Sequence, residues 1–200
     1  MKIESGNLYH VFNRGNNRSN LFFNRSHYLK FLLKIEKIII THCDILAYCL
    51  MPSHFHLLIL AGEYEESQGF HPFFSNGEIY HPLVRKLGTL QSSYARALNK
   101  EFGDTGTRFQ QKVKVKLVED ENDYPLTCFH YIHHNPVKDG IVKSLSDWEF
   151  SSFRDYANLR ESYLVNKNLA YAYLGVPKDP GKFILESGNL VNIGRPIQVF

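Results

Sequence analysis

Two histidines with a single residue between them are the part of this sequence best suited to metal chemistry. His54 and His56 lie in the apolar-rich stretch 50–60. Side chains alternate between the two faces of a strand, so both imidazoles would point to the same face. Neutral imidazole is the commonest metal ligand among protein side chains, and this pair would supply half of a coordination shell. The alternative is that the two histidines form an exposed polar face of an aromatic-rich strand.

A tyrosine and an asparagine share one face of a predicted helix later in the chain. Acidic and amide residues at the start of 121–135 favour a helix, and Pro136 predicts its end. Tyr131 and Asn135 are four residues apart, so their side chains would be neighbours on the helix surface. A tyrosine at such a position most often packs in the core or on the surface, so the spacing by itself assigns it no chemistry.

Basic side chains mark two further segments. Lys112, Lys114 and Lys116 alternate with apolar residues in 109–118, which predicts a strand with one basic face. Such a ladder could lie under a phosphate backbone, or it could be an edge strand whose charge prevents aggregation. Arg14 and Arg18 bracket an amide-rich loop, which could contact phosphates or bases or could simply be solvated.

The apolar pattern predicts the elements that would position these residues. We predict strands over 7–14 and 44–51, and a turn at Pro52 and Ser53 that leads into the strand carrying the two histidines. Helices are predicted from Ser26, as the cap, to about Thr41 and over 83–102, where Gly103 ends the second one. Both helices have an apolar stripe that would cover a sheet.

The remaining segments have weaker patterns. An inserted loop is expected at about 62–82, and short helices are expected at 148–156 and 168–174. Glycine and proline residues at 175–177 and 180–181 are expected to interrupt regular structure. The end of the chain, 188–200, could form a strand, a tail over the active site or a dimer contact.

Composition limits the class of protein. Two hundred residues with 44% hydrophobic side chains are enough for one core, and the net charge of +3 is compatible with a polyanionic partner without requiring one. No apolar run reaches membrane-spanning length and the start of the chain lacks a signal-peptide core, so we expect a cytoplasmic protein that does not enter a membrane. The three cysteines have no metal-binding spacing and are expected to be buried, reduced thiols.

The order of the motifs resembles a known family. NRG at 13–15, LMPSHFHLLI at 50–59, SYARALNKEFG at 93–103, YIHHNPVKDGIV at 131–142 and WEFSSFRDY at 148–156 follow one another as in the single-tyrosine HUH transposases. The likeness is greatest to their REP-associated tyrosine transposase branch. It extends from about residue 7 to residue 156, and the motifs with the two histidines and with Tyr131 are together specific.

The resemblance implies a role for each residue of the site. His54 and His56 match the HUH histidines and Asn135 matches a third, polar ligand, so these three would hold Mg²⁺ or Mn²⁺. Tyr131 matches the nucleophile. The metal would polarise a DNA phosphate for attack by the phenol, which would give a 5′-phosphotyrosine and a free 3′-hydroxyl. The DNA would be single-stranded or folded as a hairpin, with Arg14, Arg18, Lys112, Lys114 and Lys116 as backbone contacts and Tyr9 or Phe73 available for base stacking.

The implied fold is an α/β (α+β) variant of the ferredoxin-like fold. A mostly antiparallel central sheet, with the HUH motif on a central strand, would be covered by helices. Residues 1–156 would form the transposase domain, including the insertion at about 62–82, and 157–200 would be a carboxyl-terminal extension packed on it. A monomer and a homodimer both fit this resemblance.

The functional prediction is a metal-dependent enzyme that nicks single-stranded DNA and transfers strands at REP-like hairpins in bacteria. The main alternative is a domesticated protein that binds hairpin DNA without cleaving it. A metal hydrolase that uses His54 and His56 with bound water is a third reading, although no carboxylate base accompanies them in the motif.

Overall fold

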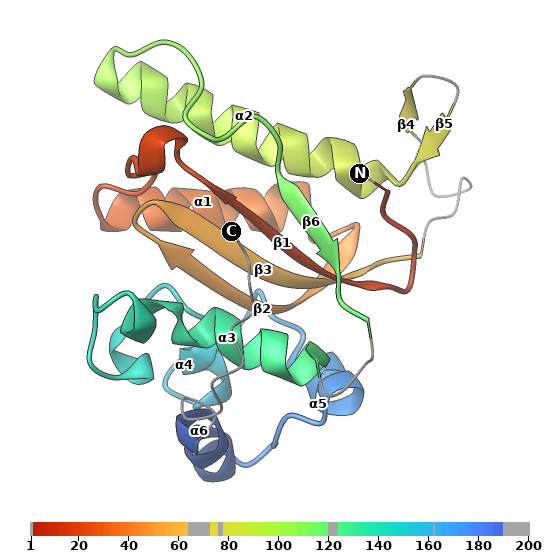
Figure 1. Cartoon of the computed structure of the whole chain (residues 1–200), viewed down its shortest axis with the longest axis vertical. Helices are drawn as coiled ribbons and strands as arrows, with labels where there is room; N and C mark the ends of the chain where they lie inside the picture. Colours follow the sequence, from red (N-terminus) through yellow and green to blue (C-terminus); the bar gives the residue numbers. More distant parts are fainter. Residues whose placement is uncertain (1, 64–72, 76–77, 120–123, 162, 190–200) are drawn as a thin grey trace.

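The computed structural model of the protein describes residues 2–63, 73–75, 78–119, 124–161 and 163–189. Figure 1 shows three layers, with a sheet between two groups of helices. In chain order the elements are β1 (Leu8–Arg14), the 3-10 turn η1 (Asn16–Arg18), α1 (Arg25–Ile38), β2 (Cys43–Met51), β3 (His54–Ala61), β4 (Phe73–Ser75), β5 (Glu78–Tyr80), α2 (Pro82–Phe102), β6 (Lys114–Leu117), α3 (Tyr124–Lys138), η3 (Leu145–Asp147), α4 (Phe153–Tyr156), α5 (Lys167–Leu174) and α6 (Pro180–Asn189).

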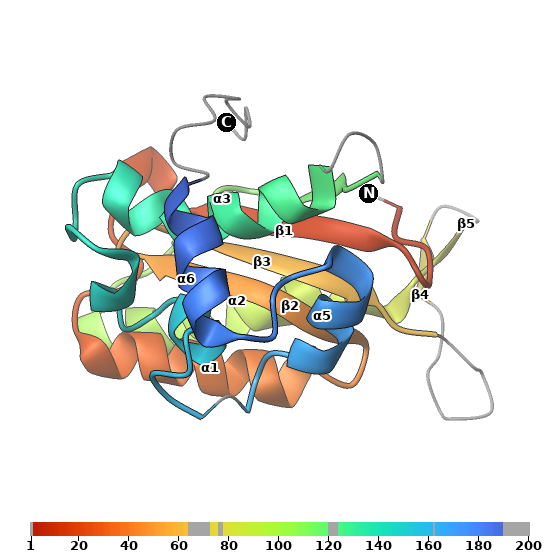
Figure 2. The same cartoon turned by 90° about the horizontal axis from the view of Figure 1, so that it is seen from below.

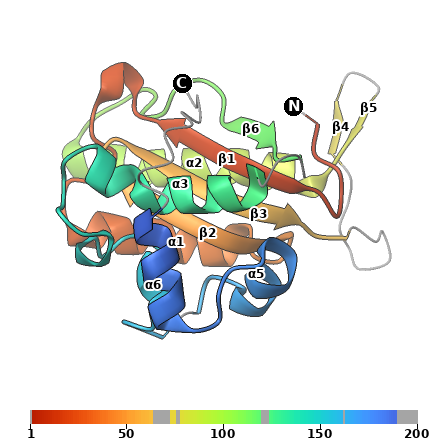
Figure 3. The same cartoon turned by 60° about the horizontal axis from the view of Figure 1, so that its bottom comes forward.

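The central sheet has the strand order β2-β3-β1-β6, and all of its neighbouring strands are antiparallel. Helices α1 and α2 cover one face of this sheet, and α3 lies across the other face (Figure 3). The predicted α+β fold, with a mostly antiparallel sheet and the histidine strand inside it, is confirmed. Because β3 is an inner strand, its residues are held by hydrogen bonds to partners on both sides.

The inner strands β1 and β3 are buried along almost their whole length because helices cover both of their faces. Phe55 of β3 packs against Phe31 of α1, with ring centroids 5.2 Å apart, and Phe31 also meets Tyr94 of α2 at 4.9 Å. On the other face Phe129 of α3 packs on Tyr156 of α4. A strand with one solvated face would alternate apolar and polar side chains. These strands are buried on both faces and therefore lack that alternation.

Each edge of the sheet is protected in a different way. The segment 150–152 runs beside β2, where the Leu50 N–H donates to the Phe150 carbonyl and the Ser152 N–H donates to the Tyr48 carbonyl, both at 2.9 Å. The opposite edge is β6, whose lysine side chains are exposed. A covered edge and a charged edge both prevent strand addition by another chain.

Three predicted boundaries are wrong for local reasons. Asn24, and not Ser26, caps α1, because the Asn24 side chain accepts from the His27 N–H. Helix α1 ends at Ile38, earlier than the expected Thr41. The expected break at 180–181 is instead the start of α6, since proline needs no N–H partner in a first helical turn and Asp179 accepts from the Lys182 N–H.

The strand predicted over 109–118 is shorter, because only Lys114–Leu117 belong to the sheet ladder. Phe109 still pairs with Gly15, and Lys114 pairs with Phe12. Between these two pairs the chain advances by five positions on the side of β6 but by only three on the side of β1, so the two strands cannot stay in register. The Asn13 side chain donates to the Gln110 carbonyl at 3.0 Å, in the gap where the ladder is interrupted. Lys112 therefore lies before β6 and not within it.

The appended segments partly agree with expectation. In the region expected as an inserted loop, β4 and β5 pair antiparallel, whereas 64–72 and 76–77 lie outside the described residues, as does 190–200 of the expected tail. Helix α5 matches the expected helix at 168–174 and α4 occupies the end of the one expected at 148–156. Figure 2 shows α6 crossing in front of the strands to reach α3.

Cys43, Cys49 and Cys128 are buried and free, as predicted. Within the described part of the chain, every helix is too short or too polar to cross a membrane.

Candidate active site

The two histidines of β3 lie together on the face of the sheet that α3 covers. His54 pairs with Arg14 of β1 and His56 pairs with Phe12, and the two imidazole centroids are 5.1 Å apart with perpendicular rings. Burial lowers the pKa of His54 to about 4, against a small opposing effect of Asp139, and lowers the pKa of His56 well below its usual value. Both rings are therefore neutral near pH 7 and keep a nitrogen lone pair, which a metal ligand requires.

A third histidine, His10 of β1, belongs to the same cluster and was missed by the sequence analysis. Its Nε2 lies 2.9 Å from Nδ1 of His56, so one of these two nitrogens donates a hydrogen bond to the other. His10 is fully buried, and burial lowers its pKa to about 3. Strand alternation could have placed His10 and Phe12 on one face, but the β1–β3 register that brings that face beside His56 is not written in the local pattern.

Helix α3 places Tyr131 over this cluster. The Tyr131 ring centroid is 5.9 Å from that of His56 and 6.2 Å from that of His10, both in edge-on geometry. Tyr131 is half-buried, and burial raises its pKa to about 12. The ammonium of Lys138 lies 5.4 Å from the phenol ring centroid. The phenol is thus protonated near pH 7, and a positive charge lies beside it.

Asn135 is buried one turn after Tyr131 and is bonded to its own helix. Its Nδ2 donates to the carbonyl of Tyr131 at 2.9 Å and to that of Ile132 at 3.3 Å. Since carbonyls only accept, the amide must direct its NH₂ group to them, and Oδ1 is the atom left for another partner.

Pro136 does not end α3, contrary to prediction, since the helix continues to Lys138. A proline inside a helix leaves the carbonyl four residues earlier without its usual N–H donor, and here that carbonyl belongs to Ile132. The Asn135 amide donates to the same carbonyl. This side-chain bond replaces the missing backbone bond and allows the helix to extend past the proline.

The donors in this cluster fit a divalent cation, provided that an amide oxygen takes part. Within the described residues no group of three His, Cys, Asp or Glu side chains is arranged to hold a metal ion. Two neutral imidazoles therefore need a third ligand of another type, and the Oδ1 of a buried asparagine is of a suitable type. The remaining positions of the ion would be open to water or to a substrate oxygen.

Arg14 and Arg18 lie at the end of β1, near the tip of the histidine hairpin. Arg14 is partly buried on the same face as His54, whereas Arg18 is exposed in η1. The Gly15 N–H donates to the Ser53 carbonyl at 2.8 Å, which ties this loop to the turn before His54. A β-carbon on Gly15 would lie 2.1 Å from the Ser19 carbonyl oxygen, so the close turn that carries both arginines requires glycine.

The predicted lysine ladder is only partly regular. Lys114 pairs with Phe12 and Lys116 pairs with His10, so both side chains stand on the face that carries the histidines, at its exposed edge. Their ammonium groups lie 5.8 Å from the Phe12 ring centroid and 5.4 Å from that of Tyr124. Lys112 is exposed before the strand begins.

The two aromatic residues expected to stack on bases have different outcomes. Tyr9 is 4% exposed on the opposite face of β1, and its hydroxyl accepts from the Glu4 N–H at 2.9 Å. That expectation is wrong for Tyr9, because its neighbour His10, and not Tyr9, faces α3. The side chain of Phe73 lies outside the described residues.

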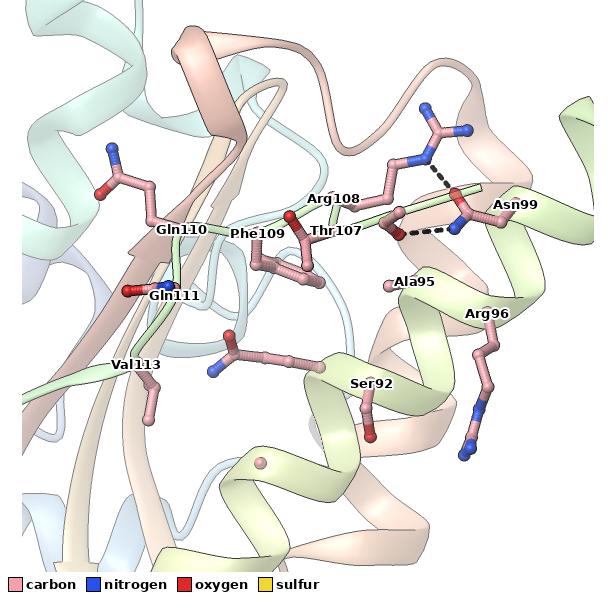
Figure 4. A pocket seen from close by; sticks show the side chains of 13 residues that line it. Ser92, Ala95, Arg96, Asn99, Thr107, Arg108, Phe109, Gln110, Gln111 and Val113 are labelled. Atoms are coloured by element: carbon pink, nitrogen blue, oxygen red, sulfur yellow. Dashed lines mark hydrogen bonds between the residues drawn. The ribbon is translucent and has the colours of Figure 1, made fainter. Parts of the chain in front are cut away.

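A separate cavity of about 360 Å³ lies between α2 and the segment before β6 (Figure 4). Amide and guanidinium groups line it, among them those of Gln91, Asn99 and Arg108. Asn13 does not line the cavity, but its buried amide donates to Oε1 of the lining residue Gln91 at 2.7 Å. Because α2 covers the face of the sheet opposite to α3, this cavity is distinct from the histidine and tyrosine cluster.

Two comparisons with known proteins found relatives, whereas no family model matches the chain. A curated protein of Haemophilus influenzae, provisionally named a REP-associated tyrosine transposase, is 27% identical over 110 residues. The match covers 55% of this chain and 58% of that protein, so this chain spans little more than half the length of its curated relative. A solved structure titled as a REP-associated tyrosine transposase bound to a REP hairpin superposes with a TM-score of 0.58 and 24% identity, over 82% of this chain and 85% of that one.

These findings confirm the resemblance drawn from the motifs and the fold that it implied. At 24% identity the likeness to the solved structure speaks for the fold, and the hairpin is a property of that protein. The roles of His54, His56, Asn135 and Tyr131, the metal and the DNA contacts remain predictions.

Proposed function

We propose, from the resemblance to REP-associated tyrosine transposases, that this chain nicks and rejoins single-stranded DNA beside a hairpin, with Tyr131 as the nucleophile. The observation that carries the proposal is the meeting of two elements far apart in sequence. Helix α3 brings the Tyr131 ring to 5.9 Å from that of His56, which shares its face of β3 with His54. A solvated histidine face or a tyrosine used only for packing would not need this convergence.

In the proposed step the phenol oxygen of Tyr131 attacks the phosphorus of the scissile linkage. The bond from phosphorus to the 3′ oxygen breaks, so that a 5′-phosphotyrosine and a 3′-hydroxyl result. The phenol gives up its proton and the departing oxygen takes one, so no net proton is consumed. Since the phosphoester bond is conserved, the 3′-hydroxyl of a second strand can reverse the step without a nucleotide cofactor.

His54, His56 and the Asn135 amide oxygen would hold the Mg²⁺ or Mn²⁺ that the resemblance implies. Such a cation supplies positive charge that neutralises the phosphate and favours phenolate formation. Two nitrogen ligands should make Mn²⁺ bind more tightly than Mg²⁺, which prefers oxygen. The ammonium of Lys138 adds a second positive charge beside the phenol, whose pKa burial has raised.

The geometry supports a nucleophile that serves its own chain. The rings of Tyr131, His56 and His10 meet within a single chain, so a homodimer that exchanges α3 is not needed to assemble the cluster. A dimer in which each chain keeps its own tyrosine stays compatible with this proposal.

The DNA would approach along the basic rim of the same face. Lys114 and Lys116 stand at its exposed edge, and Arg14 lies beside His54 at one end. Arg18 and Lys112 are exposed on the neighbouring loops. Phosphate contacts from such side chains position a strand without reading its sequence. A bacterial chromosomal substrate agrees with the cytoplasmic location that the sequence predicts.

The decisive experiment is to incubate the protein with a labelled hairpin oligonucleotide that has single-stranded flanks, in the presence of Mn²⁺. We expect a protein–DNA adduct that survives denaturation and is lost in Tyr131→Phe. The matched control is Tyr173→Phe, because Tyr173 is an exposed tyrosine on α5, outside the cluster.

The outcome also separates the two alternative functions. Hairpin binding without an adduct in the wild-type protein would favour the domesticated DNA-binding protein. Cleavage without an adduct would favour a hydrolase that uses water as the nucleophile. Either result would overturn the proposed role of Tyr131.

A further inference from the structure

A hydrogen bond of 2.9 Å between Nε2 of His10 and Nδ1 of His56 links two fully buried imidazoles. A neutral imidazole carries one N–H and one lone pair, so only two arrangements are available. Either His56 donates from Nδ1 to Nε2 of His10, or His10 donates from Nε2 to Nδ1 of His56. The first arrangement leaves a lone pair on Nε2 of His56, and the second puts a hydrogen there.

Only the first arrangement allows His56 to bind a cation. With Nδ1 engaged by His10, Nε2 is the one ring nitrogen of His56 that could face a metal ion, and it must be unprotonated to do so. We propose that His10 is a positioning residue that accepts the Nδ1–H of His56, fixing both its tautomer and its ring orientation for cation binding. This inference rests on the proposed function, because it assigns a role within the proposed metal site.

The surroundings of His10 suit a residue that positions His56 and not one that binds the cation itself. Its ring is fully buried and meets the His56 ring edge to edge, with centroids 5.1 Å apart and an interplanar angle of 26°, and its centroid lies 4.8 Å from that of Phe12. Within the described residues the other ring nitrogen, Nδ1, is buried and has no hydrogen-bond partner. The bond to His56 is thus the polar interaction that holds the His10 ring. Partners of this kind behind a metal-bound histidine commonly change metal affinity by about 10- to 100-fold.

The test compares Mn²⁺ affinity in the full chain without DNA, measured from the electron paramagnetic resonance signal of free Mn²⁺. His10→Phe keeps a buried ring but removes the acceptor, and we expect about 10- to 100-fold weaker binding. His10→Gln retains an amide oxygen that can accept from Nδ1 of His56, and its affinity should stay near that of the wild type. Tyr9→Phe, which removes a hydroxyl from the opposite face of the same strand, is the stability control.

A second measurement does not depend on any variant folding. Nitrogen-15 NMR of the wild-type imidazoles in the presence of Mg²⁺ should show His56 protonated at Nδ1 and not at Nε2. A folded His10→Phe with wild-type Mn²⁺ affinity would overturn the role of His10 and leave the metal site intact. A His56 protonated at Nε2 in the loaded protein would overturn both the role of His10 and that of His56 as a ligand. If the wild type binds no Mn²⁺, or binds it with the same affinity as His56→Ala does, the proposed metal site is wrong. This inference then fails with it.

Discussion

At the scale of single residues, one physical cause has opposite effects on the two kinds of group in the cluster. Burial disfavours charge, so it lowers the pKa of His54 to about 4 and raises that of Tyr131 to about 12. The imidazoles become better prepared to bind a cation, while the phenol becomes harder to ionise. The proposed chemistry therefore depends on positive charge arriving with the metal and the substrate, beyond that of Lys138.

Asn135 provides a test at this scale, because its amide donates to two carbonyls. In Asn135→Asp a carboxylate would face the carbonyl oxygens of Tyr131 and Ile132 without a hydrogen to donate. We expect a loss of about 1–3 kcal/mol in the free energy of unfolding without metal, measured by urea denaturation. Asn20→Asp, at an exposed position, is the control and should change stability little. Equal stability of Asn135→Asp and wild type would contradict the assigned amide orientation.

At the scale of elements, the histidine face of the sheet combines a closed interior with an open rim. Helix α3 covers His10 and His56, whereas β6 at the edge presents Lys114 and Lys116 to solvent. In the β1–β6 register Lys114 lies opposite Phe12 and Lys116 lies opposite His10, so both lysines are on the sheet face that carries the histidines. An edge strand that only needed protection from aggregation could carry charge on either face, so the location favours a role in binding a polyanion.

Lys114 and Lys116 can be tested by the salt dependence of hairpin binding. Each phosphate contact that is lost should reduce the slope of log affinity against log salt concentration by about 0.7–0.9. We expect this reduction in Lys114→Gln and in Lys116→Gln, measured by fluorescence anisotropy. Lys37→Gln, on α1 at the far side of the sheet, should leave the slope unchanged. Unchanged slopes in the β6 variants would assign these lysines to edge protection.

At the scale of the whole molecule, histidines connect α3 to the carboxyl-terminal segments. His130 Nδ1 lies 3.2 Å from Ser187 Oγ of α6, and His134 Nε2 donates to the Ser187 carbonyl at 2.9 Å. His133 Nε2 lies 2.7 Å from Ser152 Oγ, in the segment that borders β2. Burial lowers the pKa of all three, with His130 at about 4. The helix that carries Tyr131 is therefore held from both sides by uncharged histidines.

These shifts predict that acid destabilises the fold. Above pH 6.5 the buried histidines are neutral in both the folded and unfolded states and contribute no pH dependence. Below it the unfolded chain binds protons that the folded chain does not bind, so the free energy of unfolding should fall with pH. The contributions of His54 and His130 end near pH 4, where they protonate in the fold, and that of His10 ends near pH 3. Each such histidine can contribute up to about 1.4 kcal/mol per pH unit.

Urea denaturation at pH 7, 6 and 5 measures this loss directly. The slope with pH should be shallower in His133→Gln, which retains a polar group for Ser152 but cannot titrate. The comparison uses slopes, because the substitution also changes stability at neutral pH. Equal stability at pH 7 and pH 5 in the wild type would show that the buried histidines do not control acid sensitivity.

The sequence by itself determined most elements and the chemistry of their residues. An apolar run after the turn at Pro52 and Ser53 predicted the strand that carries His54 and His56, and the acidic and amide start of 121–135 predicted the helix that carries Tyr131 and Asn135, because such signals are local properties. The same local rules misplaced the cap of α1 and the end of α3. In both cases a nearby asparagine side chain, from Asn24 or Asn135, satisfies backbone groups that residue type alone does not reveal.

Only the tertiary structure decided which of these residues meet. His10 could not be assigned to the cluster until the antiparallel register of β1 and β3 placed it against His56, and Tyr9 was excluded by the same register. The approach of Tyr131 depends on α3 packing against one particular face of the sheet. Contacts between residues 46 and 75 positions apart arise from global packing, in which every element constrains the others, and no local pattern encodes them.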